Sequence, residues 1–535
     1  MTRAMGYNQL YLDLVAGKPE AKRLYPAGSM RDVADRLARI SFPRNALAKI
    51  LERQNKIFKS KPTTFANIQS LRQNTTVVAA AGQQAVLFGG PLMILYKAIW
   101  LAKSARRLSA DLGAPVIPVF TIAADDHDFE EINHVHLFDV LGEPTAQRYH
   151  SNDYPGLPAF QQKFTNEATF AELQVSLKES LGRTDFTAET LMRLFDAYRP
   201  GADFVTSFGR YLADILPDLG VVFFSPGDDE FKQLASPAIS EIVERHVELK
   251  ETLRQSNGAI TSSGYNLQVQ KDEESCHIFA LTPERTPIKR VGAEFQVGAE
   301  RMTISSLQEA VAIKAQYFSP DVLTRPIVAA RIFPTLMQGG GAAEVAYFAQ
   351  LAPLYEVFDR PAPIFAGRAG ATLVEKRFEK LLSRHHLTPA DFWGDNEHVI
   401  SATLEKSFPD DLATRFAKLR SDYQSLFDSL AGRVTEFDKS LVGNAEQVWG
   451  KIFHALEIFE TKTLAAHKKK LADERASLYR AANAFFPRRN LQERVISPLY
   501  YFSRYGYRVI DFIVDRLRDD TSDQQILYLS DMENE

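Results

Sequence analysis

Two short apolar segments separated by a long amphipathic segment stand out in the first quarter of the chain. The apolar segments are Val77–Ala81 and Val116–Ile122, and polar residues follow each of them. Between them, Leu92–Leu112 carries apolar residues at helical spacing and ends at Gly113. This order predicts a strand, a helix and a second strand parallel to the first, joined as a right-handed βαβ unit.

Further apolar stretches extend this unit into a larger sheet. Val221–Phe224 and Pro363–Ala366 predict two more core strands. The residues at about 141–215 are polar, and those at about 256–315 have β-like character, so both stretches are predicted to be insertions in the core. In the second insertion, strands are expected at Asn266–Val269, Cys276–Leu281 and Pro287–Val291.

The character of the sequence changes at Leu412. From there to Leu441 apolar residues alternate at intervals of three and four, which is the pattern of a coiled coil. Gly443-Asn444 interrupts the repeat, which resumes from Ala445 to Phe459. We therefore predict two long antiparallel helices that meet at Gly443. A hairpin of this length cannot cover its own apolar seam, so we expect it to mediate self-association.

These patterns divide the chain into three regions. Residues 1–370 are expected to form the core with its two insertions, and residues 371–485 the helical coiled-coil domain. Residues 486–535 return to a compact apolar helical pattern, so this segment is expected to pack on the core.

Composition and charge narrow the class of protein. The 535 residues are 45% hydrophobic and 24% charged, which is ordinary for a globular chain. A net charge of −4 provides no basic field for nucleic acid. Cys276 is the single cysteine, so no intramolecular disulfide or four-cysteine zinc site forms, and a cytoplasmic setting fits. No signal peptide is expected, and no apolar run of about 18 residues predicts a membrane helix.

Glycines and glutamines follow the first predicted strand, at Gly82-Gln83-Gln84, Gly89 and Gly90. Ligands of parallel α/β sheets collect at the carboxyl ends of the strands, and glycines permit close approach of the backbone to a phosphate. The glutamines end a buried strand and need hydrogen-bonding partners. The spacing matches neither G-x-G-x-x-G nor a P-loop, so a turn that only positions the next helix is the alternative.

A charged cluster, Asp126-His127-Asp128, follows the second predicted strand. His127 is a candidate general base for an attacking amine, with the neighbouring carboxylates orienting its ring. The alternative is a cluster that caps the next helix. Further metal-ligand types stand nearby at Glu130, Glu131, His134 and His136. Their spacing matches no metal signature, so we expect no dedicated metal site and favour Mg²⁺ that arrives with a nucleotide.

Three basic residues are candidates for binding anions. Lys97 lies one to two turns into the predicted helix and could reach a phosphate, although such a lysine more often lies on a solvated helix face. Arg325 and Arg368 flank predicted core strands. They could clamp a malate-like carboxylate through two parallel hydrogen bonds, or form structural ion pairs.

A glycine-rich turn at Gly339–Gly341 predicts the start of a helix from about Ala342 to Phe358. Gly340 and Gly341 are therefore candidate binding residues at a helix N-terminus. Glu344 lies in the first turn of this helix, where it could bind a substrate amine or complement the helix dipole.

Five segments spread over nearly the whole chain resemble one protein family. They are VVAAAGQQAVLFGGPLMILYKA at 77–98, PVFTIAADDHDFEEINH at 118–134, SPDVLTRP at 319–326, AEVAYFAQL at 343–351 and FPRRNLQERV at 486–495. Together they resemble the bacillithiol-biosynthesis cysteine ligase family. DHDFEEINH is the most specific of these motifs, and its Asn133 is added to the candidate binding residues.

The resemblance implies a fold, a reaction and partners. The family is similar to class I aminoacyl-tRNA synthetases, which implies an α/β fold with a Rossmann-like parallel-sheet core, inserted connecting-peptide subdomains and an α-helical antiparallel coiled coil used in homodimers. The implied reaction joins L-cysteine to glucosaminyl-malate through an amide bond. It implies activation of a carboxylate by ATP or another nucleotide with Mg²⁺, and no tightly bound cofactor. Gln83 and Gln84 stand near where the synthetase histidine signature would fall.

The chain also departs from the family pattern at several predicted strand ends. Ala329-Ala330 replaces a Gln-Asp pair, Gly341-Ala342-Ala343-Glu344 replaces a Gly-Pro-Gly-Glu turn, Gly370 replaces a serine and Ala81 a threonine. These differences motivate two alternatives: a dimeric binding protein without catalytic activity, and a ligase for a related sugar–acid acceptor.

Overall fold

The computed structural model of the chain describes residues 7–25, 28–151, 156–282, 284–405 and 411–533. They form two compact units. Unit 1 comprises Met1–Glu375 together with Pro487–Glu535, and unit 2 comprises Lys376–Phe486. None of the helices in the described ranges is long and apolar enough to cross a membrane.

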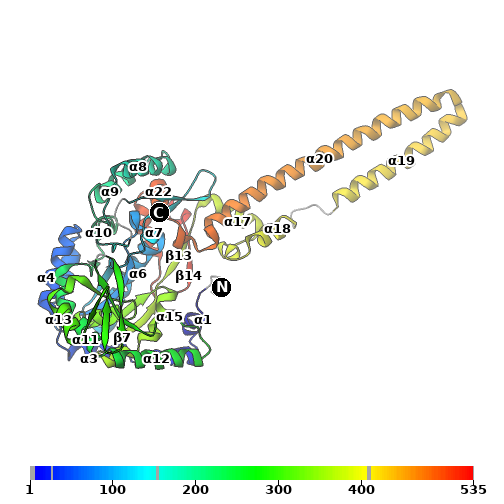
Figure 1. The fold of residues 1–535 in the computed structure, drawn as a ribbon. Coiled ribbons are helices and arrows are strands. Elements are labelled where there is room, and N and C mark those ends of the chain that lie inside the picture. Colours follow the sequence, from blue (N-terminus) through cyan, green and yellow to red (C-terminus); the bar gives the residue numbers. More distant parts are fainter. Residues whose placement is uncertain (1–6, 26–27, 152–155, 283, 406–410, 534–535) are drawn as a thin grey trace. The chain divides into compact units, whose positions relative to one another are not determined.

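A five-stranded sheet, parallel throughout, forms the centre of unit 1 (Figure 1). In spatial order its strands are β12 (Ile364–Gly367), β11 (Thr335–Gly340), β1 (Val77–Gln84), β2 (Val116–Ala123) and β5 (Val222–Phe224). The central strands β1 and β2 pair over their whole length, so their carboxyl ends lie together. The predicted α/β class with a parallel sheet is confirmed.

The helix α6 (Leu92–Leu112) joins β1 to β2 and has the bounds that the sequence predicts. Gly113 ends it in the left-handed conformation, at φ 70°, and its N–H donates to the Ser109 carbonyl at 3.0 Å. Glycine adopts this conformation without steric cost, so it is a common helix terminator. The crossover therefore follows directly from the sequence pattern.

Edge strand β5 is completed by side chains of α4 (Arg44–Ile57). The Asn55 side chain accepts a hydrogen bond from the Phe223 N–H and donates one to its carbonyl oxygen, at 3.1 and 2.8 Å. Gln54 makes the same pair of contacts with the backbone of Ser225. These contacts satisfy backbone groups that an edge strand otherwise leaves unpaired. The other N-terminal helices are α1 (Gln9–Val15), α2 (Pro19–Lys22), α3 (Met30–Ala38) and α5 (Pro62–Ser70).

The first insertion lies between β2 and β5 and is mainly helical. Its elements are α7 (Phe129–Ile132), β3 (His134–Phe138), β4 (Pro144–Arg148), α8 (Glu167–Leu181), α9 (Thr187–Ala197) and α10 (Phe204–Ile215). Strands β3 and β4 form an antiparallel pair. Aromatic rings fill the interior of this insertion, with Phe164 stacked on Phe204 at 4.4 Å between ring centroids.

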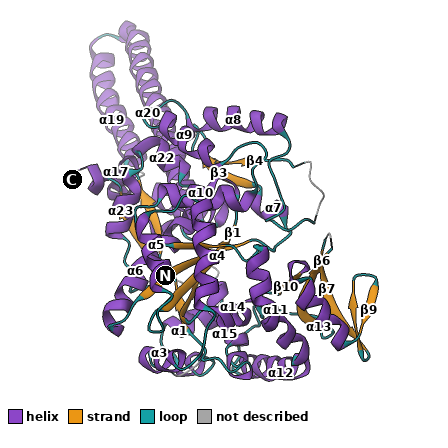
Figure 2. Cartoon of the chain, turned by 90° about the vertical axis from the view of Figure 1, so that its left-hand side faces the viewer, coloured by secondary structure: helices purple, strands orange, loops and turns teal. Residues whose placement is uncertain are grey.

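The second insertion carries a small antiparallel sheet that lies apart from the central sheet (Figure 2). In spatial order its strands are β10 (Phe318–Pro320), β6 (Ser275–Leu281), β7 (Arg285–Val291), β8 (Glu294–Val297) and β9 (Glu300–Met302). Helices α11 (Asp229–Glu244), α12 (His246–Ser262) and α13 (Ile304–Ile313) accompany it. The predicted strand Asn266–Val269 is wrong. The Gln350 side chain bonds the N–H and the carbonyl oxygen of Val269 and so takes the place of a neighbouring strand.

The segment around the triple glycine differs from its prediction. Gly339 and Gly340 end strand β11 rather than open a helix. The predicted helix from Ala342 to Phe358 is two helices, α15 (Ala342–Leu351) and α16 (Leu354–Val357), with Pro353 between them. Proline lacks a backbone N–H and cannot continue the helical hydrogen bonds, which explains the break.

The C-terminal residues return to unit 1 and add both helices and a strand. They form α21 (Gln492–Val495), α22 (Leu499–Tyr505), α23 (Arg508–Arg516), β14 (Gln524–Tyr528) and α24 (Ser530–Glu533). Strand β14 pairs in parallel with β13 (Gly370–Val374). Gln492 accepts a hydrogen bond from the Leu373 N–H at 2.8 Å and donates one to its carbonyl oxygen at 3.0 Å.

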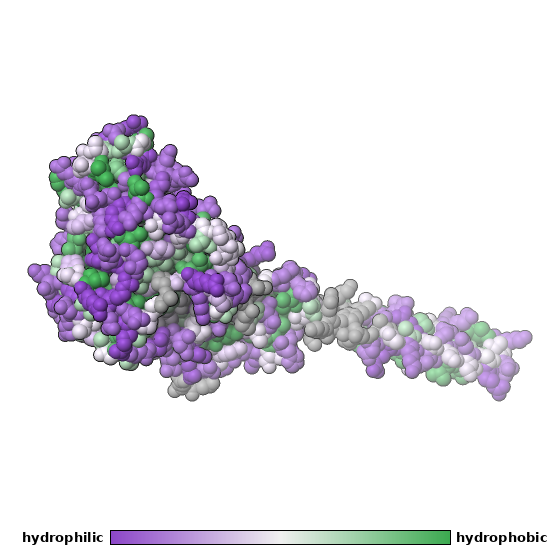
Figure 3. Space-filling model, turned by 90° about the horizontal axis from the view of Figure 1, so that it is seen from below, coloured by the Kyte–Doolittle hydropathy of each residue, from purple (hydrophilic) through white to green (hydrophobic). Residues whose placement is uncertain are grey.

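Unit 2 contains a long helical hairpin. Its elements are α17 (Lys376–His385), η4 (Pro389–Phe392), α18 (Asn396–Glu405), α19 (Leu412–Phe437), η5 (Lys439–Leu441) and α20 (Val442–Phe485). The turn lies at Asp438–Leu441, where the Asp438 side chain accepts from the Ser440 N–H, and not at Gly443, which is inside α20. Apolar side chains remain exposed along the hairpin (Figure 3), among them Leu426 at 69% and Leu430 at 64%.

Candidate active site

A cavity of about 440 Å³ lies over one face of the central sheet and reaches the carboxyl ends of its strands. Residues of both β1 and β2 line it, including Val78 and Ala80 on β1 and Val119 and Thr121 on β2. Such a cavity is where open α/β sheets bind their ligands. The predicted site residues that line it are Gly82, Gln83, Gln84, Lys97, Asp126, Arg325, Gly341, Glu344 and Arg368.

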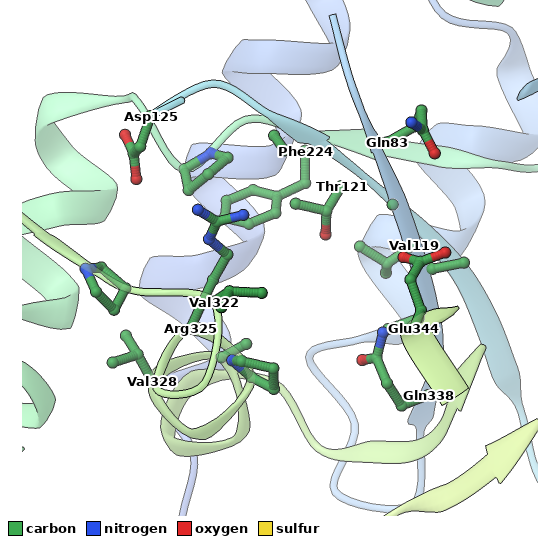
Figure 4. Close-up of a pocket in the computed structure, with 18 of the residues that line it drawn as sticks. Gln83, Val119, Thr121, Asp125, Phe224, Val322, Arg325, Val328, Gln338 and Glu344 are labelled. Atoms are coloured by element: carbon green, nitrogen blue, oxygen red, sulfur yellow. The ribbon is translucent and has the colours of Figure 1, made fainter. Parts of the chain in front are cut away.

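The polar groups of the cavity are divided between two sides (Figure 4). Asp125 and Arg325 lie on one side, whereas Gln83, Gln338 and Glu344 lie on the other. Apolar side chains such as Phe224, Val322 and Val328 contribute to the wall. The arrangement suits an elongated ligand, or two ligands, with polar groups at separate positions.

Lys97 is buried in the wall of the cavity. Its Nζ donates hydrogen bonds to the Gly82 carbonyl at 2.7 Å, to Gln83 Oε1 at 2.9 Å and to Glu344 Oε2 at 2.8 Å. Burial lowers its pKa, and the Glu344 carboxylate partly offsets this effect. The alternative of a lysine on a solvated helix face is wrong. Lys97 instead ties the end of β1 to the first turn of α15.

Glu344 is held from two directions. Its Oε2 accepts from the Gly341 N–H at 2.7 Å and from Lys97. Gly340 does not line the cavity, but a Cβ there would lie 2.5 Å from the Cβ of Glu344. The glycine therefore lets α15 begin close to the end of β11. These contacts fit the interpretation of Glu344 as a complement to the helix N-terminus.

The glycines after β1 have packing roles that the structure makes clear. A Cβ at Gly82 would lie 2.7 Å from the Thr121 carbonyl oxygen, so glycine allows the close approach of β1 and β2 there. Gly89 and Gly90 adopt φ of 81° and 68° around η2 (Leu87–Gly89) and do not line the cavity. The Gly89 N–H donates to the Tyr198 hydroxyl at 3.0 Å. Gly89 and Gly90 thus shape the turn into α6.

The carboxylate of Asp126 lies between the cavity and a second, more open hollow of about 610 Å³. Gln84 Nε2 donates to Asp126 Oδ2 at 3.0 Å, and the His127 N–H donates to Oδ1 at 2.9 Å. Burial raises the pKa of Asp126, but Arg285, Arg325 and these hydrogen bonds bring it below its ordinary value. His127 and Asp128 line only the second hollow, and the His127 ring Nδ1 is 3.6 Å from Asp126 Oδ1.

Asn133 lines the second hollow, but its side chain is already engaged. Its Oδ1 accepts from Arg148 Nη1 at 2.9 Å, and its Nδ2 donates to Glu130 Oε1 at 3.3 Å. These bonds join α7 to the β3–β4 pair. Among the described residues, no group of three or more His, Cys, Asp or Glu side chains is placed to hold a metal ion.

The two candidate arginines have different surroundings. Arg368 is buried and its Nη2 lies 2.6 Å from Glu493 Oε1, while Nη1 donates to the Ala369 carbonyl. Arg325 begins α14 (Arg325–Ile332), and its side chain extends into the cavity beside Phe224 (Figure 4). Its Nε is shielded from solvent and has no hydrogen-bond partner among the described residues. Of these two arginines, Arg325 is therefore the one whose side chain remains available to a ligand in the cavity.

Sequence reasoning missed a buried ion pair in the cavity wall. Lys232 Nζ lies 3.4 Å from Asp125 Oδ1, and both side chains are almost fully buried. A signal was present, because Lys232 falls on the buried face of α11 beside Phe231, Ala235 and Ser236. A charged residue on an apolar helix face requires a partner. Other lining residues that were not predicted are Thr121, Gln338, Tyr347 and Arg494.

Three departures from the family pattern, Ala81, Ala329 and Ala343, line the cavity, whereas Ala330 and Ala342 are buried outside its lining.

Comparison with known proteins identifies relatives over almost the whole chain. Residues 2–369 match the family model "Bacillithiol biosynthesis BshC, N-terminal Rossmann-like domain", and residues 371–529 match "Bacillithiol biosynthesis BshC, C-terminal coiled-coil domain". Three relatives are each provisionally named cysteine ligase BshC. That of Koribacter versatilis is 30% identical and covers 95% of both chains. The protein of Solibacter usitatus is 28% identical, and the match covers 86% of both chains. The protein of Salinibacter ruber is 27% identical, and the match covers 97% of this chain and 96% of the relative.

The second family model extends past the helical hairpin into residues 487–529, which fold with unit 1 in this structure. Both parts of the fold, the Rossmann-like sheet with its cavity and the helical hairpin, are thus matched in chain order by one family. The chain belongs to the BshC family of bacillithiol biosynthesis.

Proposed function

We propose that this protein is a ligase that joins L-cysteine to glucosaminyl-malate, or to a closely similar sugar–acid acceptor, through an amide bond with consumption of ATP or another nucleotide. Family membership and the ligase names of the relatives support this proposal. The observation that carries it is the cavity at the strand ends, because its polar groups stand on two sides and offer separate positions to two substrates.

A nucleotide phosphate fits the charges of the cavity. The Arg325 guanidinium extends into the cavity, and oxyanions accept charge-assisted hydrogen bonds from such a group. A bound nucleotide would transfer a phosphoryl or nucleotidyl group to the cysteine carboxylate, and this group would leave when the acceptor amine attacks the activated carboxyl carbon. Mg²⁺ is expected to arrive with the nucleotide, since this ion is commonly held by one or two carboxylates together with phosphates. Asp126 is the carboxylate that borders both hollows.

The attacking amine must lose a proton when the amide forms. In our proposal, His127 accepts this proton, and the Asp126 carboxylate stabilises the resulting imidazolium. Gln84 holds Asp126 in place through its 3.0 Å hydrogen bond. Lys97 and Glu344 keep the opposite wall fixed, because each is tied to backbone groups of the neighbouring element. The acceptor would therefore extend from the cavity into the second hollow, where His127 lies.

The direct test is to incubate the pure protein with ATP, cysteine and glucosaminyl-malate and to detect the thiol product by mass spectrometry. Product formation with nucleotide consumption is expected for the wild-type chain. His127→Ala should reduce turnover about 100-fold or more, as general-base removal does. His454→Ala, at an exposed position of α20, is the matched control and should leave turnover unchanged. Absence of both product and nucleotide consumption in the wild type would refute the ligase.

A second candidate is a dimeric binding protein without catalytic activity. The observation that favours it is that Ala81 and Ala329, where the expected family pattern has a threonine and a glutamine, both line the cavity. In this case cysteine or the acceptor would bind, as measured by calorimetry, but no product would form.

We also propose that the protein forms a homodimer through the hairpin of unit 2. An apolar groove runs between α19 and α20, and its members are Tyr423, Leu426, Phe427, Leu430, Ala431, Val434, Leu441, Asn444, Ala445, Val448, Trp449 and Ile452. Exposed apolar surface of this kind, continuous along a heptad pattern, is characteristic of an association surface.

A further inference from the structure

The C-terminal segment FPRRNLQERV at 486–495 contributes one residue to the lining of the cavity. This residue is Arg494 of α21, which lies beside lining residues of the Rossmann-like core. Arg494 is only partly buried. Among the described residues, its guanidinium makes no hydrogen bond and no ion pair. Arg494 is thus an arginine of the cavity whose N–H donors are open to a ligand.

The two residues before Arg494 fix its position. Gln492 bonds both the N–H and the carbonyl oxygen of Leu373 on β13, at 2.8 and 3.0 Å. Glu493 contacts Arg368 Nη2 at 2.6 Å. Gln492 and Glu493 are both almost fully buried. The backbone of α21 is therefore held against β13, and such preorganisation lowers the entropic cost of binding a ligand at Arg494.

Arg494 lies on the same side of the cavity as Glu344. Arg368, which the preceding residue of α21 engages, has its Nε 3.9 Å from the position that a Cβ of Gly341 would take. The Gly341 N–H in turn donates to Glu344 at 2.7 Å. Arg325 lies on the opposite side (Figure 4). A group that Arg494 binds is therefore separate from a group that Arg325 binds.

The other charged residues that line this side of the cavity are already paired. Lys97 Nζ lies 2.8 Å from Glu344 Oε2. Arg368 has the carboxylate of Glu493 as its counter-charge. Within the described ranges, Arg494 is the charged residue of this side that has no counter-charge. The side thus carries an excess of one positive charge, which favours a ligand group of negative charge.

The ring of Tyr7 supports the guanidinium of Arg494. Cζ of Arg494 lies 5.8 Å from the ring centroid, which is within the range of a cation–π contact. Tyr7 packs edge-on against Tyr11, with ring centroids 5.7 Å apart. The Tyr11 hydroxyl lies 2.8 Å from the position that a Cβ of Gly367 would take, at the end of β12. These contacts place Arg494 at the carboxyl edge of the central sheet, where ligands of α/β sheets bind.

We infer that Arg494 binds an oxyanion, either a carboxylate or a phosphate group, on the Glu344 side of the cavity. The planar fork of guanidinium donors matches both groups through two parallel hydrogen bonds. This inference rests on the proposed function and deepens it, because each proposed substrate carries such a group. Cysteine has one carboxylate, a malate-like acceptor has two, and a nucleotide has phosphates. Arg494 is accordingly a binding residue that the C-terminal segment adds to the Rossmann-like core.

Calorimetric titration of the full chain tests this inference with three separate probes: L-cysteine, malate, and ATP with Mg²⁺. Arg494→Gln should weaken binding of at least one probe about 10-fold or more. Arg494→Lys keeps the charge without the planar fork, so its affinity should be intermediate. Arg106→Gln is the matched control, because Arg106 is an exposed arginine of α6 that does not line the cavity. Its affinities should equal those of the wild type.

The probe whose affinity falls identifies the source of the oxyanion. Loss for cysteine assigns the site to the amino acid, loss for malate to the acceptor, and loss for ATP to the nucleotide. Arg494→Gln should keep the urea midpoint of the wild type, because the guanidinium makes no hydrogen bond or ion pair with the described residues. A lost affinity then reports on the site and not on folding. Unchanged affinity of Arg494→Gln for all three probes, or a wild type that binds none of them, would overturn the inference.

Failure of this inference and failure of the proposed function give different results. If the wild type forms no thiol product but binds a probe through Arg494, the oxyanion site stands and the ligase falls. If product formation is normal and Arg494→Gln has wild-type kinetic constants and affinities, the ligase stands and the oxyanion site falls.

Discussion

Replacing Glu493 by glutamine should destabilise unit 1, because it leaves the buried guanidinium of Arg368 without a counter-charge. In the wild-type chain the two groups lie 2.6 Å apart, and their side chains are only 1% and 5% exposed. Burial by itself lowers the pKa of Arg368, but the Glu493 carboxylate reverses this effect and raises it. Glu493 also accepts a hydrogen bond from the Ala371 N–H at 2.9 Å.

The size of the effect follows from this geometry. Removing one partner of a buried ion pair costs about 3–5 kcal/mol. Glutamine preserves the volume of the side chain and can still accept from Ala371, so we expect the lower end, about 3 kcal/mol. At about 1.4 kcal/mol for each factor of ten, the ratio of folded to unfolded protein should fall about 100-fold.

Equilibrium urea unfolding would measure this change. Trp100 is the single tryptophan of unit 1 and is almost fully buried, so its fluorescence reports on this unit. The two tryptophans of unit 2 should first be replaced in the reference chain, as Trp393→Phe and Trp449→Phe. The free energy of unfolding is then compared between the reference chain and its Glu493→Gln variant.

Two further variants make the reasoning refutable. Arg518→Gln breaks an exposed ion pair with Asp520 and should cause no measurable change. Arg368→Met combined with Glu493→Leu removes both charges, so it should recover most of the stability that Glu493→Gln loses. A Glu493→Gln variant within about 0.5 kcal/mol of the reference would show that the pair does not stabilise unit 1.

Three other predictions follow from the described contacts. Gly370→Ala should lower the free energy of unfolding of unit 1 by about 1–3 kcal/mol, because the new Cβ would lie 2.6 Å from Glu493 Oε2. The urea midpoint should fall accordingly, and an unchanged midpoint would contradict this prediction. Burial, His134 and Arg488 lower the pKa of His136 from 6.5 to about 4. The unfolded chain therefore binds a proton that the folded chain does not, and stability is lost as pH falls from about 6.5 to about 4. Urea midpoints measured across this range should fall less steeply for His136→Gln, and equal slopes would refute the assignment. Leu426→Lys combined with Leu430→Lys should convert the proposed dimer to a monomer in light scattering, and a persistent dimer would exclude this surface.

The sequence was sufficient for the elements whose signals are local. The apolar runs of β1 and β2, and the helix between them that ends at Gly113, lie where the pattern predicts. Strand β11 was not predicted, because its sequence TLMQGG is short and ends in two glycines that resemble a helix start. The hairpin turn was wrongly predicted at Gly443 for a similar reason. The apolar repeat is interrupted there, but the pattern does not show that helix α20 continues through the interruption.

For the candidate site, the sequence located the strand ends but not the pairing of their side chains. Lys97 was expected more often on a solvated face, and only the fold brings Glu344 next to it. The difference between Arg325 and Arg368 likewise depends on Glu493, which is far away in the sequence.

The discontinuity of unit 1 has a consequence for the order in which a newly synthesised chain folds. Strand β13 pairs with β14, which ends at Tyr528, so this pair cannot close on a ribosome until the residues up to Tyr528 have emerged. The hairpin of unit 2 is made from residues that are complete earlier and that contact one another locally, which favours rapid folding. The nascent protein should therefore carry a finished hairpin while Glu493 is still absent and Arg368 still lacks its partner. Synthesis of the segment from Pro487 to Tyr528, which includes the lining residue Arg494, is then the step that completes the wall of the cavity.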